Sequence, residues 1–385
     1  MEFIEKLLDG VEVEWKSLGS LTTLRRGRVM SKGYFVENAG NYPVFSSQTA
    51  NNGMIGRIDT FDFDGEFISW TTDGANAGTI FYRNGKFSIT NVCGLIKIDN
   101  EAVLNYRYLF YWLTIEAKKH VYSGMGNPKL MSHQVEKIPV PIPCPENPKK
   151  SLEIQAEIVR ILDAFTAMTA ELTAELTAEL NLRKKQYNYY RDQLLSFEEG
   201  EVEWKTLGSL ATITIGEFVH KDKQDDSAQY PVYNGGRTAT GYYENYNNTG
   251  NKIIVSARGA NAGFVNRVST PYWAGNSCYS IGIKDSSVLN WDFVYYFLKL
   301  SEFKLIGSQQ KGGIPAVSKK QMESFLVPVP ELAHQERIAA VLDKFDALTN
   351  SITEGLPREI ELRQKQYEYY RDLLLSFPKS DTEAA

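Results

Sequence analysis

One stretch constrains the fold of this 385-residue chain more than any other. Residues 151–197 contain neither glycine nor proline, and alanine, leucine, glutamate, lysine, arginine and glutamine dominate them. Such residues favour helix, so the stretch predicts one uninterrupted helix of roughly 70 Å. Apolar residues recur every three or four positions from Ile154 to Leu180. That spacing places the apolar residues in a stripe along one face of the helix. A helix with such a stripe needs a partner helix that buries the stripe.

The chain supplies the partner as a second copy of the same helix at residues 335–377. A shift of 180 positions aligns Gln155 with Gln335, and roughly half of the aligned positions are identical. Identity over such a length indicates an internal duplication. The first copy carries TAEL units at Thr169–Leu180, where the second copy has Gly355-Leu356-Pro357. Glycine after a helix end and proline in the first turn of the next helix predict a break there.

The segments outside the helices are duplicated too. The sequence around Trp15 reappears around Trp204, and the turn GANAG occurs at Gly74–Gly78 and at Gly259–Gly263. Short apolar runs between Gly/Asn turns predict strands, followed by an aromatic amphipathic helix and a proline-containing edge strand in each copy. The aromatic helices are expected at 103–113 and 288–298.

The predicted fold class is therefore α+β, with two α/β domains separated by two long antiparallel helices that form a coiled coil. It is an internal tandem duplication with pseudo-twofold symmetry. The predicted segments are a first globular domain at 1–150, a first long helix at 151–199, a second globular domain at 200–331, and a second long helix with the C-terminal tail at 332–385. Residues 6–10 resemble 194–200, which predicts that the N-terminal segment completes the helical layer beside the C-terminus.

Composition excludes several classes of protein. The start of the chain lacks the apolar core of a signal peptide, and no apolar run approaches the roughly 18 residues that a membrane helix needs. The three cysteines, Cys93, Cys144 and Cys278, are isolated from one another in sequence. This usage is typical of a reducing compartment and predicts a cytoplasmic protein without a disulfide framework or zinc site.

Catalytic motifs are missing as well. The sequence has no phosphate-binding loop of the G-x-x-x-x-G-K type and no strand–GxGxxG–helix unit. Lys129 follows Asn127-Pro128, which breaks the pattern of amino-methyltransferases. Ser301 and Lys304 have S-x-x-K spacing without its companion motifs, and the four histidines are scattered. We therefore predict no catalytic residues and no metal site in this chain.

The remaining candidates are polar, Gly-rich loops whose residue types read DNA. Arginine and lysine bind guanine edges or phosphates, and asparagine and glutamine pair with adenine. Corresponding loops in the two copies differ in sequence while their frameworks match, as expected if each copy reads different bases. The predicted DNA-binding residues are Arg25, Arg26, Arg28, Lys32, Ser47, Gln48, Asn52, Asn76, Lys221, Asn234, Arg237, Thr238, Arg258, Asn261, Gln309, Gln310 and Lys311. Ser46, Asn51, Asp73, His220 and Lys223 lie in the same loops, and solvated turns are the alternative interpretation for each residue.

The helix ends, RKKQYNYYRDQLLSF and RQKQYEYYRDLLLSF, are nearly identical. The same surface is therefore presented twice and could bind two copies of one partner. The candidate partner-binding residues are Tyr187, Tyr190, Arg191, Tyr367, Tyr370 and Arg371. Their spacing of three and four is equally consistent with a coiled-coil core, and the sequence leaves both interpretations open.

With the duplication, these helix ends and the TAEL units, the chain resembles the DNA-specificity subunit of type I restriction-modification enzymes, in particular the type IC subfamily. The resemblance covers essentially the whole chain. It implies two target-recognition domains, each reading one half of a split site in double-stranded DNA. It further implies helices that bind two methyltransferase subunits, with two ATP-driven restriction subunits joining that core. A membrane is not expected among the partners. S-adenosylmethionine, ATP and Mg²⁺ would belong to those partners, and this chain would bind no cofactor.

In this scheme the recognition domains engage two half-sites about one helical turn apart (roughly 34 Å), and the methyltransferases flip an adenine in each. Leu172, Leu176 and Leu180 would form a ruler, because each TAEL unit adds about 6 Å of helix. Two alternatives stay open at this point. One is a fused restriction or methylation enzyme, and the other is a coiled-coil adaptor without sequence-specific DNA binding.

Overall fold

A computed structural model describes residues 10–124, 126–198, 200–306, 315–351 and 353–378. The chain divides into two compact units. The first unit comprises residues 1–174 and 362–385, and the second comprises residues 175–361. Each unit thus combines one globular part with portions of both long helices. The domain boundaries predicted at 150, 199 and 331 stay predictions, and the predicted role of residues 6–10 falls almost wholly outside the described residues.

The first long helix is continuous, as predicted. Helix α5 spans Pro148–Leu194, 47 residues, and begins where the Asn147 side chain accepts a hydrogen bond from the Lys150 N–H (3.1 Å). The second is broken into α10 (Leu332–Asn350) and α11 (Gly355–Leu374). Gly355 has φ +80°, and a Cβ there would lie 2.4 Å from the carbonyl oxygen of Ala347. Only glycine fits this position, which confirms the predicted break.

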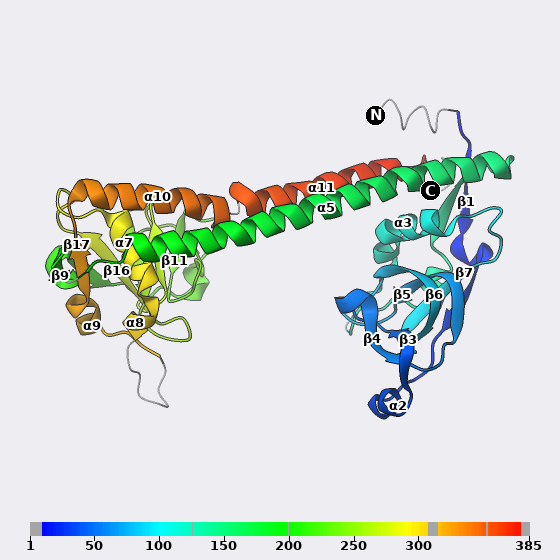
Figure 1. The fold of residues 1–385 in the computed structure, drawn as a ribbon, viewed down its shortest axis with the longest axis horizontal. Helices are drawn as coiled ribbons and strands as arrows, with labels where there is room; N and C mark the ends of the chain where they lie inside the picture. Colours follow the sequence, from blue (N-terminus) through cyan, green and yellow to red (C-terminus); the bar gives the residue numbers. More distant parts are fainter. Residues whose placement is uncertain (1–9, 125, 199, 307–314, 352, 379–385) are drawn as a thin grey trace. The chain divides into compact units, whose positions relative to one another are not determined.

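The long helices pack antiparallel within each unit (Figure 1). In the first unit Phe165 of α5 lies 5.7 Å from Tyr370 of α11, and in the second Phe345 of α10 lies 5.7 Å from Tyr190 of α5. The 180-position shift relates these two contacts to each other. Each helix therefore begins in the unit of its own copy and ends in the unit of the other copy. The tandem duplication is confirmed at the level of individual contacts.

A six-stranded sheet forms the centre of the first unit. Its neighbouring strands are antiparallel except for β3 and β6, which are parallel. A separate pair joins β1 and β8, so the proline-rich strand lies outside the main sheet as predicted. In spatial order the sheet comprises β2 (Thr22–Arg26), β7 (Cys93–Ile98), β5 (Phe63–Thr71), β6 (Ile80–Ile89), β3 (Ala39–Phe45) and β4 (Met54–Ile58), and the pair is β1 (Val13–Ser17) and β8 (Pro139–Pro143).

The second unit repeats this plan with the main sheet divided. Residues 80–89 form the single strand β6, but their counterparts form β14 and β15, and Pro271 lies between them. Proline cannot donate to a ladder, which accounts for the interruption. The sheets are β10 (Ala211–Ile215), β16 (Cys278–Ile283), β13 (Lys252–Ser256) and β14 (Val265–Val268); then β12 (Gly241–Tyr243), β11 (Tyr230–Tyr233) and β15 (Trp273–Ala274); and then β17 (Leu326–Val329) with β9 (Glu203–Thr206).

The predicted aromatic helices cover these sheets. Helix α3 (Tyr106–Glu116) packs on β5 and β6, and α7 (Trp291–Leu300) packs on β13 and β14. Each lies between its sheet and the long helices in one continuous core. The remaining short helices are η1 (Leu18–Ser20), α2 (Lys32–Glu37), η2 (Ala50–Gly53), η3 (Ala117–His120), α4 (Ser132–Val135), α6 (Leu207–Leu210), η4 (Lys221–Lys223), α8 (Glu302–Ile306) and α9 (Lys319–Ser324). Among the described residues, none of the helices has the length and hydropathy to span a membrane.

Candidate functional site

In the first unit, three of the predicted DNA-binding segments meet around one short loop, Thr90–Val92, which we call the first hub. The Arg26 guanidinium donates to the carbonyl oxygen of Asn91 (3.3 Å). The Ser47 hydroxyl and the backbone N–H of Thr72 both donate to the carbonyl oxygen of Val92. Segments 25–28, 46–48 and 72–76, distant in sequence, are thereby brought together.

The second unit has the same arrangement around residues 275–277, which we call the second hub. The Asn234 side chain accepts from the N–H of Ser277 (3.3 Å), and the Arg258 guanidinium donates to the carbonyl oxygen of Asn276 (3.3 Å). Arg237 donates to the side chain of Asn261 (3.4 Å). The structure therefore brings four predicted residues of the second copy together, although they span positions 234–261.

The GANAG turn has the same backbone in both units. Gly74 and Gly78 have φ of +90° and +80°, and Gly259 and Gly263 have φ of +92° and +81°. Glycine is therefore needed at both ends of each turn for its left-handed backbone. The residue before each turn differs, because Asp73 stands where the second copy has Arg258. The same backbone turn therefore follows an acidic residue in the first unit and a basic residue in the second.

The other predicted residues that the structure describes make no side-chain hydrogen bond to the hubs. Arg28 pairs with Asp62 (3.1 Å), and hydrogen bonding to Tyr34 and Asp62 raises the pKa of its guanidinium. Gln48 donates to the carbonyl oxygen of Met54 (2.6 Å). Lys32 begins α2 and Lys221 begins η4, while the side chains of Arg25, Asn52, Asn76 and Thr238 are exposed. Gln309, Gln310 and Lys311 lie outside the described residues.

Each globular part is joined to a long helix through a buried glutamine. The Gln155 side chain accepts from the Asn105 N–H (2.9 Å) and donates to the carbonyl oxygen of Val103 (2.9 Å). Gln335 repeats this with Asn290 (2.8 Å) and Val288 (3.0 Å). Both glutamines have 0% exposure. Since the two asparagines cap α3 and α7, each glutamine fixes the start of the aromatic helix against the long helix.

A charged junction lies further along the same interface. In the first unit, Arg107 of α3 pairs with Asp163 of α5, to which the Tyr111 hydroxyl also donates (2.5 Å). In the second unit the cation comes from strand β14 instead. Arg267 binds Asp292 of α7 (2.5 Å) and Asp343 of α10 (2.7 Å), and the Tyr296 hydroxyl donates to Asp343 (2.7 Å).

The long-helix ends divide into a packed face and an exposed face. Tyr187 is half-buried against Phe345 (ring centroids 6.3 Å apart), and the Thr166 hydroxyl donates to the Tyr367 hydroxyl (3.1 Å), so the coiled-coil interpretation describes these two residues. Tyr190 and Tyr370 lie at the border of the two faces, because their rings pack on Phe345 and Phe165 while they remain 45% and 40% exposed. Arg191 and Arg371 bind the neighbouring Asp192 and Asp372 at 2.7 Å each.

The most exposed side chains at these helix ends were not among the predicted partner-binding residues. Tyr189 and Tyr369 are 62% and 61% exposed, and the side chains of Asp192 and Asp372 are 56% and 57% exposed. We call Tyr189, Tyr190 and Asp192, with their counterparts 180 positions later, the paired YYD surfaces. The identity of the two helix ends was the signal that could have revealed them.

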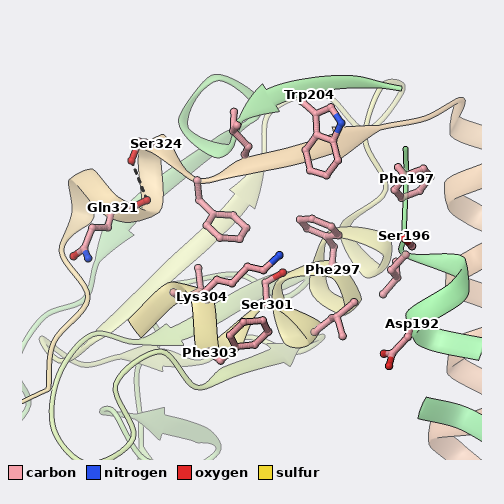
Figure 2. Close-up of a pocket in the computed structure, with 15 residues that line it drawn as sticks. Asp192, Ser196, Phe197, Trp204, Phe297, Ser301, Phe303, Lys304, Gln321 and Ser324 are labelled. Atoms are coloured by element: carbon pink, nitrogen blue, oxygen red, sulfur yellow. Dashed lines mark hydrogen bonds between the residues drawn. The ribbon is translucent and has the colours of Figure 1, made fainter. Parts of the chain in front are cut away.

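Beside each YYD surface lies a groove that the duplication repeats. In the second unit it has a volume of about 860 Å³, and Figure 2 shows Phe197, Trp204 and Phe297 facing it from three different segments. The first-unit groove has a volume of about 570 Å³ and uses the equivalent Phe377, Trp15 and Trp112. The rims differ, because Phe303 and Lys304 of the second groove correspond to Lys118 and Lys119 of the first.

The described residues hold no group of three or more His, Cys, Asp or Glu side chains that could bind a metal ion. Burial raises the pKa of Cys93 to about 11 and that of Cys278 to about 12, so both thiols are protonated at neutral pH. Protonated, buried thiols are poor nucleophiles. Neither cysteine is therefore a candidate catalytic group.

Comparison with known proteins identifies the family. The family model described as "Type I restriction modification DNA specificity domain" matches residues 10–182 and 199–362. The chain is 40% identical over 413 residues to the Type I restriction enzyme EcoR124I/EcoR124II specificity subunit of Escherichia coli, covering 99% of this chain and 98% of that protein. It is 33% identical over 377 residues to the putative type I specificity subunit S.MpnORF507P of Mycoplasma pneumoniae, covering 95% and 98%.

Solved structures share the fold. A type I restriction-modification S subunit from M. genitalium matches with a TM-score of 0.53 and 17% identity, covering 97% of this chain and 98% of that one. A chain from a study of complex assembly and conformational transition of the type I R-M system matches with a TM-score of 0.58 and 15% identity, covering 94% and 97%. The chain therefore belongs to the family of type I restriction-modification DNA specificity subunits.

Proposed function

We propose that this chain selects a bipartite site in double-stranded DNA, with each unit reading one half-site through the loops around its hub. The observation that carries this proposal is the match between the two hubs. Their backbone frames agree, and both retain the asparagine of the GANAG turn, as Asn76 and Asn261. The residue before that turn differs, because Arg258 stands where the first unit has Asp73. A shared frame with different donors and acceptors suits two unlike half-sites.

The chemistry belongs to partners in this proposal. The chain itself is non-catalytic, and S-adenosylmethionine, ATP and Mg²⁺ bind to methyltransferase and restriction subunits. Two methyltransferase subunits dock on the paired YYD surfaces, and two restriction subunits join that core. The near-equal exposures of the two surfaces support docking of the same subunit twice, because aromatic residues are favoured at protein interfaces. We place this function in the cytoplasm with the DNA.

Methylome sequencing tests the recognition half of the proposal. The chain is co-expressed with the methyltransferase subunit of its own system, and methylated adenines are mapped across the host genome. We expect one bipartite motif with two fixed half-sites and an unread spacer. Methylation by the chain alone would support the fused-enzyme alternative. A chain that forms the complex but yields no motif would support the adaptor alternative.

The docking half is tested by counting bound methyltransferase subunits. Tyr189→Ala and Tyr369→Ala are made singly and together, and the mass of the purified complex is measured by light scattering. Each single variant should lose one methyltransferase subunit, and the double variant should lose both. Tyr246→Ala, a 49% exposed tyrosine of a loop in the second unit, is the control and should keep both. Full occupancy of the double variant would contradict docking at these surfaces.

A further inference from the structure

One buried cation in the first unit has no carboxylate partner. Arg83 of β6 is only 3% exposed, and within the described part of the chain no carboxylate oxygen lies within 4 Å of its guanidinium. Phe45 and Phe81 face it, with ring centroids 3.7 Å and 4.5 Å from Cζ. A buried charge is normally paired, so the groups that replace the missing carboxylate are informative.

Those groups are neutral oxygens, and one of them belongs to a predicted DNA-binding loop. Nε of Arg83 donates to the Ser69 hydroxyl (2.9 Å), and Nη1 donates to the carbonyl oxygen of Asn52 (2.9 Å). Nη2 has no hydrogen-bond partner among the described residues. A Cβ on Gly53 would lie 3.0 Å from Nη2, so the loop backbone closes directly over the guanidinium.

The loop has a backbone that needs such support. Asn51, Asn52 and Gly53 have φ of +52°, +53° and +80°, three consecutive residues in the left-handed region. L-residues disfavour this region, although asparagine tolerates it better than most. The bond from Arg83 to Asn52 is made in the observed loop conformation, which orients that carbonyl oxygen towards the guanidinium. The cation and the left-handed turn therefore stabilise each other.

The same conformation exposes two amides at the loop tip. Asn51 and Asn52 are exposed, whereas the stem residues Ser47 and Gln48 bond to carbonyl oxygens of the protein. An exposed asparagine amide can donate to N7 and accept from N6 of adenine in the major groove. The loop thus has a fixed stem and two free adenine-reading groups at its tip.

We propose that Arg83 is the positioning residue of base readout by the first unit, holding Asn51 and Asn52 in the geometry that recognises adenine in the first half-site. This inference rests on the proposed function. It assigns a specificity role to a buried side chain that itself touches no DNA. Burial lowers the pKa of Arg83 to about 10, so the guanidinium stays protonated at neutral pH.

The second unit lacks this device. The GANAG turns lie 185 positions apart, which places Val268 opposite Arg83 and Ile254 opposite Ser69. The equivalent loop uses Gly235 at φ +82° and contains the side chain of Asn234, which accepts from the second hub. Losing Arg83 should consequently affect the first half-site alone, and the second half-site serves as an internal reference.

The test compares methylomes of Arg83→Lys and Arg83→Met with wild type, each in complex with the methyltransferase. Lysine keeps the buried charge but cannot reach Ser69 and Asn52 together. We expect both variants to relax one or two adenine positions of the first half-site at least tenfold in base preference, with the second half-site unchanged. Asn52→Ala should relax one of the same positions. Asn84→Ala, an exposed neighbour on β6, is the control and should leave the motif intact.

Two outcomes would overturn the inference. In one, the lysine variant lowers methylation equally at all sites without changing any base preference, which is the signature of lost stability alone. In the other, Asn52→Ala leaves every adenine position intact. If Arg83→Met does not fold, the lysine variant still decides. Failure of the proposed function looks different, because the wild-type chain would then yield no bipartite motif.

Discussion

The two units build the same junction with an arginine from different elements. Arg107 stands on the aromatic helix of the first unit, and Asp292 occupies that aligned position in the second. Arg267 stands on strand β14, where the first unit has Tyr82. The acceptor Asp163 or Asp343 on the long helix and the donor Tyr111 or Tyr296 are the same in both. The two copies therefore retain the contact between the globular part and the long helix. The arginine of that contact comes from the aromatic helix in one copy and from a strand in the other.

The two long helices also differ between the copies. α5 runs unbroken through both units, whereas its copy is interrupted between α10 and α11 at Gly355. An uninterrupted helix transmits a change in length over its whole extent, but a broken one can absorb it at the break. The two copies thus share the contact between globular part and long helix, but only one of the two long helices is continuous.

The largest expected effect comes from shortening the continuous helix. Deleting Thr177–Leu180 removes about 6 Å of helix. We expect methylation of the parental sites to be lost and sites with a spacer about one base pair shorter to be methylated, with both half-sites unchanged. Methylome sequencing measures this directly. Thr177→Ala keeps the helix length and should keep the parental spacing. Continued methylation at the parental spacing by the deletion variant would refute the ruler formed by Leu172, Leu176 and Leu180.

Next in size is the loss of a buried glutamine. Gln155→Leu and Gln335→Leu each leave a buried N–H and carbonyl group without a partner, which should lower the free energy of unfolding of the affected unit by about 3 kcal/mol. Both glutamines make the same two bonds to the start of an aromatic helix, so the two losses should be similar. Each has one further acceptor, the Ser151 hydroxyl for Gln155 (3.1 Å) and the Pro330 carbonyl oxygen for Gln335 (2.8 Å). Urea unfolding followed by hydrogen exchange in α3 and α7 measures them separately. Gln193→Leu, at an exposed site on α5, should cost neither unit stability. A loss of stability in one unit without a similar loss in the other would contradict the equivalence of Gln155 and Gln335.

Removing the arginine from the charged junction should destabilise the second unit more than the first. Arg267→Met leaves Asp292 and Asp343 without their cation and should cost the second unit about 2 kcal/mol, because Asp292 is only 22% exposed and loses its partner in a poorly solvated position. Arg107→Met strands only Asp163, which is 42% exposed and better solvated, so the cost to the first unit should be about 1 kcal/mol. The same hydrogen-exchange experiment compares them. Equal costs, or a larger cost for Arg107, would contradict the comparison.

The smallest effect is a loss of stability at alkaline pH. Burial and the hydrogen bond to Asp163 raise the pKa of Tyr111 to about 12, and burial with the bond to Asp343 raises that of Tyr296. A raised tyrosine pKa contributes stability that is complete below the unfolded value of about 10 and is lost as pH rises towards the folded value. Each tyrosine should cost its unit about 1 kcal/mol at pH 11. Urea midpoints between pH 8 and 11 should fall less steeply in Tyr111→Phe and Tyr296→Phe.

Much of the architecture followed from local sequence. The continuous helix, the break at Gly355, the aromatic helices and the proline-containing edge strands were all predicted, because each depends on residues close together in the chain. The hubs were predicted only as scattered loops. Arg83 was overlooked, although an arginine inside the apolar strand FYRNGKF was a visible signal. Its meaning depends on Asn52, Ser69 and Phe45, which no periodicity connects to it.

The sequence by itself determined the duplication, the helical frame and the family, because repeats and helix-forming patterns are properties of order along the chain. Tertiary structure alone decided which side chains make the antiparallel contact in each unit, namely the Phe165–Tyr370 and Phe345–Tyr190 pairs. It also decided that the junction arginines come from unaligned positions. Such contacts join residues tens to hundreds of positions apart, and packing and charge fix their pairing only once the chain has folded.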